Sequence, residues 1–268
     1  LALPLILRGR KYILEYRSPW SIEVEREFGR GPWTSISSLI ERLALKHAFI
    51  ITLTTSRLLP RVQPYRKPTY VIPNYPLKSF QHPSRSRDEL RRKLCVSEEE
   101  KVILFVGKLS RVEGADVLLH AIPKVLERGV NAVFWIVGDG PLHPALKGLE
   151  QKYPGGVRVF GWMPHRLIPD LINASDVCVA PRHEDPYSRY YNEEGLHKIS
   201  EYMAFQKPIV ACGIAESTEY MLVGEGRFVD GIMQALRGEV PQPTPRFWEE
   251  HCEEKIFRLL DFIQKTPR

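Results

Sequence analysis

Residues 101–137 read KVILFVGKLSRVEGADVLLHAIPKVLERGVNAVFWIV. Apart from Lys101, the runs 101–106 and 132–137 are apolar and rich in Val, Ile, Phe and Trp, which indicates strands buried on both faces of a parallel sheet. Between them, residues 114–128 have the apolar spacing of a helix. A strand, a glycine-bounded turn, a helix and a second strand in this order predict a βαβ unit.

The same alternation continues toward the carboxyl end of the chain. Further helices are predicted at 141–152, 166–173 and 194–205, and further strands at 157–160, 176–180 and 208–212, with a short one near 227–229. We therefore expect an α/β fold with a Rossmann-like, doubly wound parallel sheet.

The amino-terminal side carries a second, smaller set of α/β signals. Residues 11–16 and 48–54 are predicted strands, and an amphipathic helix is predicted at 35–47. Proline is dense in the segment that follows, and we place a domain junction near Pro73 to Pro83 because such density breaks helices and strands. The expected parts are residues 1–75 as a partial second α/β domain, residues 76–245 as the main domain, and residues 246–268 as a closing helix.

The composition is that of a soluble globular protein. Of the 268 residues, 43% are hydrophobic and 26% are charged, which argues against a disordered chain. No apolar run approaches the roughly 20 residues of a membrane-spanning helix. The cysteines lack metal-ligand spacing, so we interpret them as reduced core thiols of a cytoplasmic protein and expect no metal site. They are Cys95, Cys178, Cys212 and Cys252.

The net charge of +6 is concentrated in one stretch of the chain. Between Arg57 and Lys93 there are ten Lys and Arg residues and two acidic residues, a balance of +8. This stretch could face lipid headgroups, a phosphorylated acceptor or nucleic acid, or it could be a solvated connector. The connector is the simplest interpretation, and nucleic acid is least favoured because no basic-aromatic module accompanies the charge. Peripheral contact with a membrane stays open.

Ligands of open parallel sheets bind at the carboxyl ends of the strands, where loops lead into helix N-termini. The first such loop, GKLSRVEG, runs from Gly107 to Gly114. Its glycines let a ligand approach the backbone, and Lys108 and Arg111 add positive charge beside a helix N-terminus. This combination suits a diphosphate, but it is also a common structural turn. The GxGxxG fingerprint is not found after a strand, so a nicotinamide or flavin enzyme is not favoured.

The later loop and helix, residues 182–211, read RHEDPYSRYYNEEGLHKISEYMAFQKPIVA. In it, Glu193 and Glu201 stand eight residues apart. A carboxylate can accept hydrogen bonds from both hydroxyls of a ribose, and each charge-assisted bond contributes roughly 1.5–3 kcal/mol. Glutamates near a helix N-terminus are also favoured electrostatically, so the spacing by itself leaves both interpretations open.

Several short blocks occur in a fixed order along the chain. They are VIPN at 71–74, FVGKL at 105–109, IVGDGP at 136–141, VFGWM at 159–163, ASDVCVAP at 174–181, EYMAFQKPIV at 201–210 and FWE at 247–249. Together with the Glu193–Glu201 spacing, these blocks resemble the family-4 retaining glycosyltransferases (glycosyl transferases group 1), which have the two-domain GT-B fold. The resemblance covers about residues 70–265 and implies a C-terminal nucleotide-sugar-binding domain preceded by a truncated acceptor domain.

The resemblance implies a role for each matching residue. Glu201 would hold the ribose of the nucleotide, and Glu193 would contact the donor sugar or its α-phosphate. Lys108 stands where the family has a diphosphate-binding arginine, so Glu193 and Lys108 are the candidate catalytic residues. The other donor-binding candidates are Gly107, Arg111, the backbone amides at Leu196, His197 and Lys198, and the turn from Gly161 to Met163 beside the base.

Three positions depart from the family pattern. The family has a second diphosphate-binding cation, a lysine, where this chain has Glu113, which would repel a diphosphate if it pointed inward. We therefore infer that Arg111 replaces the missing charge. Gln206 and Tyr75 stand where the family has glycine, and both are interpreted as tolerated.

The acceptor side is short in this sequence. Residues 12–20 (YILEYRSPW) resemble a late strand of the acceptor domain, and Arg17 is the candidate for the residue that faces the cleft. The glycine-rich acceptor loop of the family is not found in the sequence, so we expect the chain to be incomplete for catalysis.

The expected function is a retaining, metal-independent transfer of a sugar from a nucleoside-diphosphate sugar, with no cofactor. The acceptor, such as a glycan or a lipid-linked sugar, and the donor base are not specified by the sequence. Two alternatives stay open. One is a nucleotide-sugar epimerase of the same fold, which would turn over the donor without an acceptor. The other is a non-catalytic binding or scaffold protein, which Glu113 and the short acceptor side favour.

Overall fold

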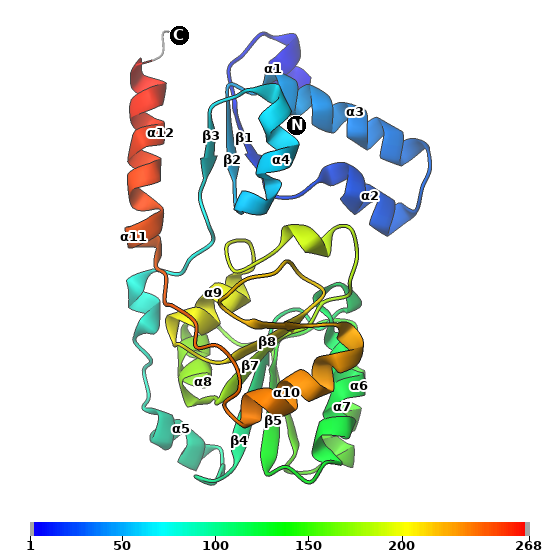
Figure 1. Ribbon diagram of the computed structural model, residues 1–268, viewed down its shortest axis with the longest axis vertical. Helices are drawn as coiled ribbons and strands as arrows, with labels where there is room; N and C mark the ends of the chain where they lie inside the picture. Colours follow the sequence, from blue (N-terminus) through cyan, green and yellow to red (C-terminus); the bar gives the residue numbers. More distant parts are fainter. Residues whose placement is uncertain (1–2, 266–268) are drawn as a thin grey trace.

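A computed structural model of the chain describes residues 3–265. They form two parallel sheets, a three-stranded sheet near the amino terminus and a six-stranded sheet that follows it along the chain (Figure 1). Residues 1–2 and 266–268, at the ends of the expected parts 1–75 and 246–268, lie outside the described residues.

The six-stranded sheet has the order β6-β5-β4-β7-β8-β9, and each neighbouring pair is parallel. Its strands are β4 (Lys101–Val106), β5 (Ala132–Val137), β6 (Val157–Gly161), β7 (Val177–Ala180), β8 (Ile209–Cys212) and β9 (Met221–Val223). The first strand of this sheet, β4, lies in its middle. The chain then adds β5 and β6 on one side of β4, returns, and adds β7, β8 and β9 on the other side. This is the doubly wound α/β topology predicted from the sequence, and it is confirmed.

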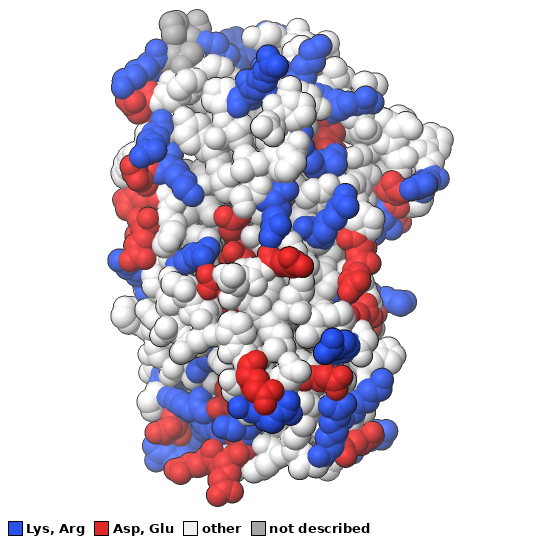
Figure 2. Space-filling view, in the orientation of Figure 1, with Lys and Arg blue, Asp and Glu red and all other residues white. Residues whose placement is uncertain are grey.

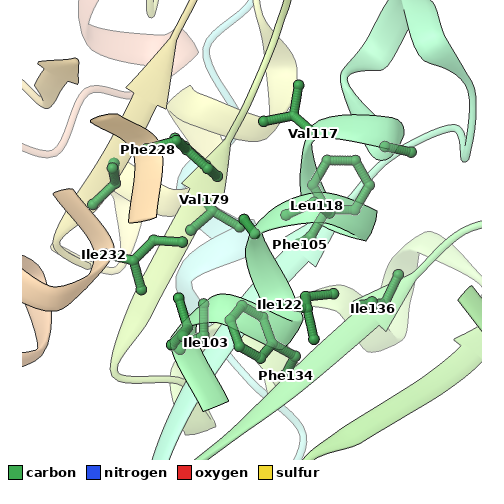
Figure 3. Packing of buried hydrophobic residues seen from close by; sticks show 14 of the residues in the cluster. Ile103, Phe105, Val117, Leu118, Ile122, Phe134, Ile136, Val179, Phe228 and Ile232 are labelled. Atoms are coloured by element: carbon green, nitrogen blue, oxygen red, sulfur yellow. The ribbon is translucent and has the colours of Figure 1, made fainter. Parts of the chain in front are cut away.

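Helices cover both faces of this sheet. Alternate side chains of β4 point to opposite faces, so Ile103 and Phe105 pack in one core cluster while Val102 and Leu104 pack in the other. Figure 3 shows the first cluster, where Phe105 and Ile103 meet apolar side chains from the neighbouring helices. The helices on that face are α6 (Ala115–Leu126), α7 (His143–Lys152) and α10 (Phe228–Leu236), and those on the other are α5 (Arg87–Lys93), α8 (Ile168–Ala174) and α9 (His197–Ala204).

The three-stranded sheet has the order β1-β2-β3 and its own core. Its strands are β1 (Ile13–Tyr16), β2 (Ile50–Leu53) and β3 (Thr69–Val71), and its helices are α1 (Leu3–Leu7), α2 (Trp20–Phe28), α3 (Pro32–His47) and α4 (Leu59–Val62). The predicted strands and helix are confirmed, with α3 starting earlier at Pro32. The sequence did not reveal α2, because Trp20–Phe28 has four glutamate and arginine residues among its nine and no buried residue.

The proline-dense segment is more ordered than expected. It contains α4 and β3, so proline does not prevent regular structure there: Pro60 stands at the start of a helix, where its missing N–H costs nothing. Many cations of the basic stretch Arg57–Lys93 make ion pairs with other parts of the chain. These pairs are Arg61–Glu41, Lys78–Glu250, Arg85–Asp170, Arg87–Asp176 and Arg91–Asp176. On the face shown in Figure 2, basic side chains accordingly lie over both parts of the molecule with acidic side chains among them.

The end of the main domain differs from the prediction. The prediction of a short strand near 227–229 is wrong, because the edge strand is β9 (Met221–Val223) and residue 228 already begins α10. Four of the nine residues of α10 are buried against the sheet, so its amphipathic pattern outweighs the β-like run FV at its start. The chain then forms α11 (Trp248–His251) and α12 (Glu253–Lys265), and α12 returns to lie beside β3, with Phe262 5.8 Å from the ring of Phe49 (Figure 1).

Three cysteines, Cys178, Cys212 and Cys252, are buried as expected. Cys95 is exposed, so its assignment to the core is wrong. It follows α5 in a left-handed conformation (φ 53°) and precedes Val96, which returns to the core. Within residues 3–265, every helix is too short or too polar to cross a bilayer.

Candidate functional site: a cavity beside Glu201

Glu201 lies near the start of α9, at the carboxyl end of the sheet, and only 8% of its surface is exposed. Its Oε1 accepts a hydrogen bond from Nε2 of His165 at 2.7 Å. His165 belongs to a short 3-10 turn, His165–Leu167, directly after the loop that follows β6. The hydrogen bond to Glu201 raises the pKa of His165 above its ordinary value, because the carboxylate favours the protonated imidazole.

Glu201 forms part of the wall of a cavity of about 770 Å³, a volume typical of small-molecule sites. One side of the cavity comes from α9 and the His165 turn, and the other from the connector between the two sheets. Its principal polar and aromatic lining residues are Asn74, Tyr75, Phe80, His165, Arg166, His197 and Glu201. Phe80 stacks on the His165 ring with 5.1 Å between centroids, so an aromatic surface lies next to the carboxylate.

The His165–Glu201 pair predicts a pH-dependent stability. Because the folded-state pKa of His165 is raised, the pair stabilises fully below the ordinary histidine pKa of about 6.5 and loses its effect as pH rises through the folded-state value. We expect His165→Gln to lower the melting temperature at about pH 6 and to differ little from the parent at about pH 9. A constant difference across this range in thermal unfolding would contradict the pairing.

The turns after β4, β5 and β6 pack tightly against one another. The amide of Gly138 donates to the carbonyl of Gly161 at 2.8 Å, and the amide of Gly107 donates to the carbonyl of Val137 at 3.0 Å. A Cβ at Gly107 would lie 2.8 Å from Nζ of Lys198, so this glycine leaves space for the lysine amine. The turn at Gly107 therefore meets α9 one helical turn before Glu201.

Lys198 is held by Glu113. Its Nζ lies 2.9 Å from Oε2 of Glu113, and Arg182 makes an ion pair with the other oxygen of the same carboxylate. Burial alone would raise the pKa of Glu113, but Lys198 and Arg182 outweigh it and keep the pKa below its ordinary value. Glu113 thus points inward, which is the orientation that would repel a diphosphate, but two cations compensate its charge.

Two predicted donor-site residues lie elsewhere. Arg111 is exposed, pairs with Asp116 at 3.3 Å and lines a different cavity from that of Glu201, so its assignment to the diphosphate stays a prediction. The amide of Leu196 is already bonded to the carbonyl of Asn192 at 3.0 Å, because residues 192–195 form a turn. The amides of His197 and Lys198 are the first two of α9, and the first amides of a helix have no partner within the helix and can bind a ligand.

Glu193 is buried, with 7% of its surface exposed, and it faces the carboxyl-terminal segment. Nη1 of Arg246 lies 3.6 Å from its Oε1, while Oε2 has no hydrogen-bond partner among the described residues. Arg246 also bonds Glu219 at 2.6 Å and the hydroxyl of Tyr75 at 3.1 Å. The structure therefore places Glu193 against Arg246 and does not bring it to the wall of the Glu201 cavity.

The remaining predicted residues surround the site. Lys108 is exposed on the turn after Gly107. Gly161 has a left-handed conformation (φ 72°) that only glycine adopts easily, and Met163 packs against the core cluster beneath the loop. Arg17 is exposed directly after β1 and lies 3.7 Å from Glu15. Burial, together with the positive charge of Arg17, lowers the pKa of His197.

The connector between the sheets fixes the loop before α9. Asn74 donates from its backbone to the carbonyl of Glu194 at 2.8 Å and from its side chain to the carbonyl of Gly195 at 3.1 Å. The carboxylate of Glu194 accepts hydrogen bonds from the backbone and hydroxyl of Ser56, both at 2.6 Å. Ser56, which follows β2, and Asn74 of the connector thus position the loop that leads into α9.

Sequence reasoning missed His165, Arg166, Phe80 and Arg182. The first two follow the VFGWM block within four residues, so a titratable pair just after the predicted base-binding turn was an available signal. Phe80 and Arg182 carry no such signal, because their contacts join segments far apart in the chain.

Residues 100–238 match the family described as glycosyl transferases group 1, which is more than half of the chain. The chain belongs to this family. Among curated relatives, it is 30% identical over 182 residues to an alpha-D-kanosaminyltransferase of Streptomyces kanamyceticus, covering 65% of this chain and 40% of the relative. It is 39% identical over 154 residues to an uncharacterized glycosyltransferase of Methanocaldococcus jannaschii, covering 56% of this chain and 33% of the relative. The chain thus matches less than half the length of these relatives.

Solved structures share the fold. Sucrose-phosphate synthase from Thermosynechococcus elongatus superposes with a TM-score of 0.68 at 19% identity, covering 98% of this chain and 69% of that one. The Anabaena protein HepE, solved in complex with UDP and glucose, superposes with a TM-score of 0.69 at 15% identity, covering 99% of this chain and 74% of that one. The two sheets and their arrangement are therefore those of GT-B glycosyltransferases.

Proposed function

We propose that this chain binds a nucleoside-diphosphate sugar in the cavity beside Glu201, as the donor side of a sugar transfer. The observation that carries the proposal is the position of Glu201: a buried carboxylate in the wall of a cavity of about 770 Å³, near the N-terminus of α9. Such a carboxylate can accept hydrogen bonds from two ribose hydroxyls while the amides of His197 and Lys198 attract phosphate.

The names of the relatives support a transferase. The kanosaminyltransferase is named for the transfer of a sugar, and the structurally similar HepE was solved with UDP and glucose. Neither fixes the donor of this chain, so the base and the sugar are left to experiment.

The proposed reaction breaks the bond between the anomeric carbon and the diphosphate oxygen and forms a bond from that carbon to the oxygen of an acceptor hydroxyl. The departing diphosphate takes the electron pair of the broken bond and accepts the proton of the hydroxyl. The resemblance to family-4 enzymes suggests retention of configuration. Lys108, Lys198 and the helix amides would stabilise the charge of the departing diphosphate, so the proposal assigns this role to protein cations rather than to a metal. The acceptor, a glycan or a lipid-linked sugar, would approach from the side of Arg17.

A thermal-shift panel tests donor binding. We expect at least one of UDP, GDP and ADP, or a sugar derivative of one of them, to raise the melting temperature by several degrees, because ligand at 100 times Kd stabilises by about 2.7 kcal/mol. The matching nucleosides, which lack phosphate, are the control and should give smaller shifts. If no nucleoside diphosphate or nucleotide sugar shifts the transition, the proposed function is wrong.

A further inference from the structure

Residues 183–186 begin the long loop between β7 and α9, and their backbone contributes little to holding them in place. Within the described chain, none of their amides or carbonyls makes a backbone hydrogen bond. Arg182, just before them, is fixed, because its amide donates to the carbonyl of Cys212 at 3.0 Å. A Cβ at Gly213 would lie 2.1 Å from the carbonyl oxygen of Arg182, so the two segments are in close backbone contact. The loop therefore leaves its packed neighbours at His183.

The side chain of His183 ties this segment to two other elements. Its Nε2 lies 2.9 Å from Oδ2 of Asp116, on the first turn of α6. Its Nδ1 lies 3.0 Å from Oε2 of Glu225, in the turn after β9. Among residues 3–265, no other hydrogen bond or ion pair joins residues 183–186 to another element. The hold on this segment thus depends on one imidazole.

Both contacts of His183 require a protonated ring. A neutral imidazole has one N–H and can donate to only one of the two carboxylates, while its other nitrogen presents a lone pair. At about 3 Å this lone pair would face a carboxylate oxygen and repel it. An imidazolium donates from both nitrogens, and both bonds are then charge-assisted. The link between the three elements is therefore complete only when the proton is present.

The groups around His183 favour this proton. Burial lowers the pKa of His183, but the hydrogen bonds and charges of Glu225 and Asp116 outweigh it and hold the pKa above its ordinary value. Arg111 also pairs with Asp116, but its side chain is 82% exposed, so solvent screens its charge.

The other charged or titratable groups near His183 lie in the same cavity of about 350 Å³ or beside it in the chain. They are His120 and Lys124 of α6, and Arg182 and Glu184. His120 bonds the backbone carbonyl of Asp116 and leaves the carboxylate to His183. From α10, the cavity receives the apolar residues Phe228 and Val229.

The loop that begins at His183 connects both parts of the molecule. The hydroxyl of Tyr187 donates to Oε1 of Glu23, on α2, at 2.6 Å. Residues 184–186 and Arg189 line a cavity of about 690 Å³, together with the turn after β8. Movement of residues 183–186 would therefore change a wall of this cavity. It shares no lining residue with the Glu201 cavity.

We propose that His183 is a proton-controlled clasp, which holds residues 183–186 against α6 and the turn after β9 when protonated and releases them when neutral. Because the folded-state pKa of His183 is raised, the clasp is complete below the ordinary histidine pKa of about 6.5 and is lost as pH rises through the folded-state value. The clasp goes beyond the proposed function and does not depend on it.

Limited proteolysis with trypsin tests the clasp in the full chain. The rate of cleavage after Arg189, in the loop, is divided by the rate after the exposed Arg237, so that the pH dependence of trypsin itself cancels. We expect this ratio to rise about threefold or more from pH 6 to pH 9, because proteolysis follows the population of the open form. In His183→Gln, whose amide cannot be protonated, the ratio should be high and equal at both pH values. His120→Gln is the matched control and should behave like the parent.

An NMR titration of the His183 imidazole gives a second measurement. We expect a midpoint above about 6.5 in the parent and a lower midpoint in Glu225→Gln, which removes one of the two carboxylates. Glu225 is partly exposed, so this variant also decides the matter if His183→Gln does not fold. A cleavage ratio that stays constant with pH in the parent, or rises equally in His183→Gln, overturns the inference. A titration midpoint that Glu225→Gln leaves unchanged overturns it as well.

Discussion

Replacing Glu201 with alanine is expected to weaken nucleoside diphosphate binding about thirtyfold or more, which corresponds to roughly 2 kcal/mol. The carboxylate lies in the wall of the cavity, and the proposal gives it both hydroxyls of the ribose. Losing two charge-assisted hydrogen bonds therefore removes a large part of the affinity. Isothermal calorimetry on parent and variant, at the same salt concentration, measures the change.

Two controls make this result specific. Glu98→Ala removes an exposed glutamate from the turn before β4 and should leave the affinity unchanged. The circular dichroism spectrum of Glu201→Ala should match that of the parent, which shows that the fold is kept. Equal affinity in parent and Glu201→Ala would contradict the assignment of the ribose to this carboxylate.

The second large effect is expected from Gly138→Ala, which should lower the free energy of unfolding by at least about 3 kcal/mol. A Cβ at this position would lie 1.8 Å from the carbonyl oxygen of Gly107, and the backbone has φ 137°. A methyl group cannot fit, so the turns after β4 and β5 must separate. Chemical denaturation measures the loss.

Gly148→Ala is the matched control for this prediction. Gly148 lies exposed on α7, and no atom is within 4 Å of its expected Cβ. Alanine there should leave stability unchanged or raise it by about 0.5–1 kcal/mol, because glycine is unfavourable inside helices. A similar loss of stability in both variants would show that the contact between Gly138 and Gly107 is not the cause.

The central strands were predictable because burial on both faces requires apolar side chains along their whole length. The runs at β4 and β5 face core clusters on both sides, so nearly every residue must be apolar, and the predicted limits agree with the structure. The two three-residue strands were not predictable in this way. β3 has only three residues, all partly buried, and β9 is a partly buried edge strand, so neither produces a long apolar run.

The candidate site was predictable only where one segment carries the signal. The position of Glu201 follows from its spacing and the motif around it, and the structure places it at a cavity near a helix N-terminus. The partners of charged residues were not predictable, because they depend on contacts between distant segments. Arg111 turns to Asp116, Glu193 faces Arg246, and Arg182 reaches Glu113, and no local pattern distinguishes these arrangements from the expected ones.

The most direct test of the donor site is a crystal structure of the chain with a bound nucleoside diphosphate. We predict ribose hydroxyls within hydrogen-bonding distance of the Glu201 carboxylate, and phosphate oxygens beside the turn at Gly107 and the first amides of α9. A nucleotide bound elsewhere, with Glu201 still bonded only to His165, would contradict the proposed site.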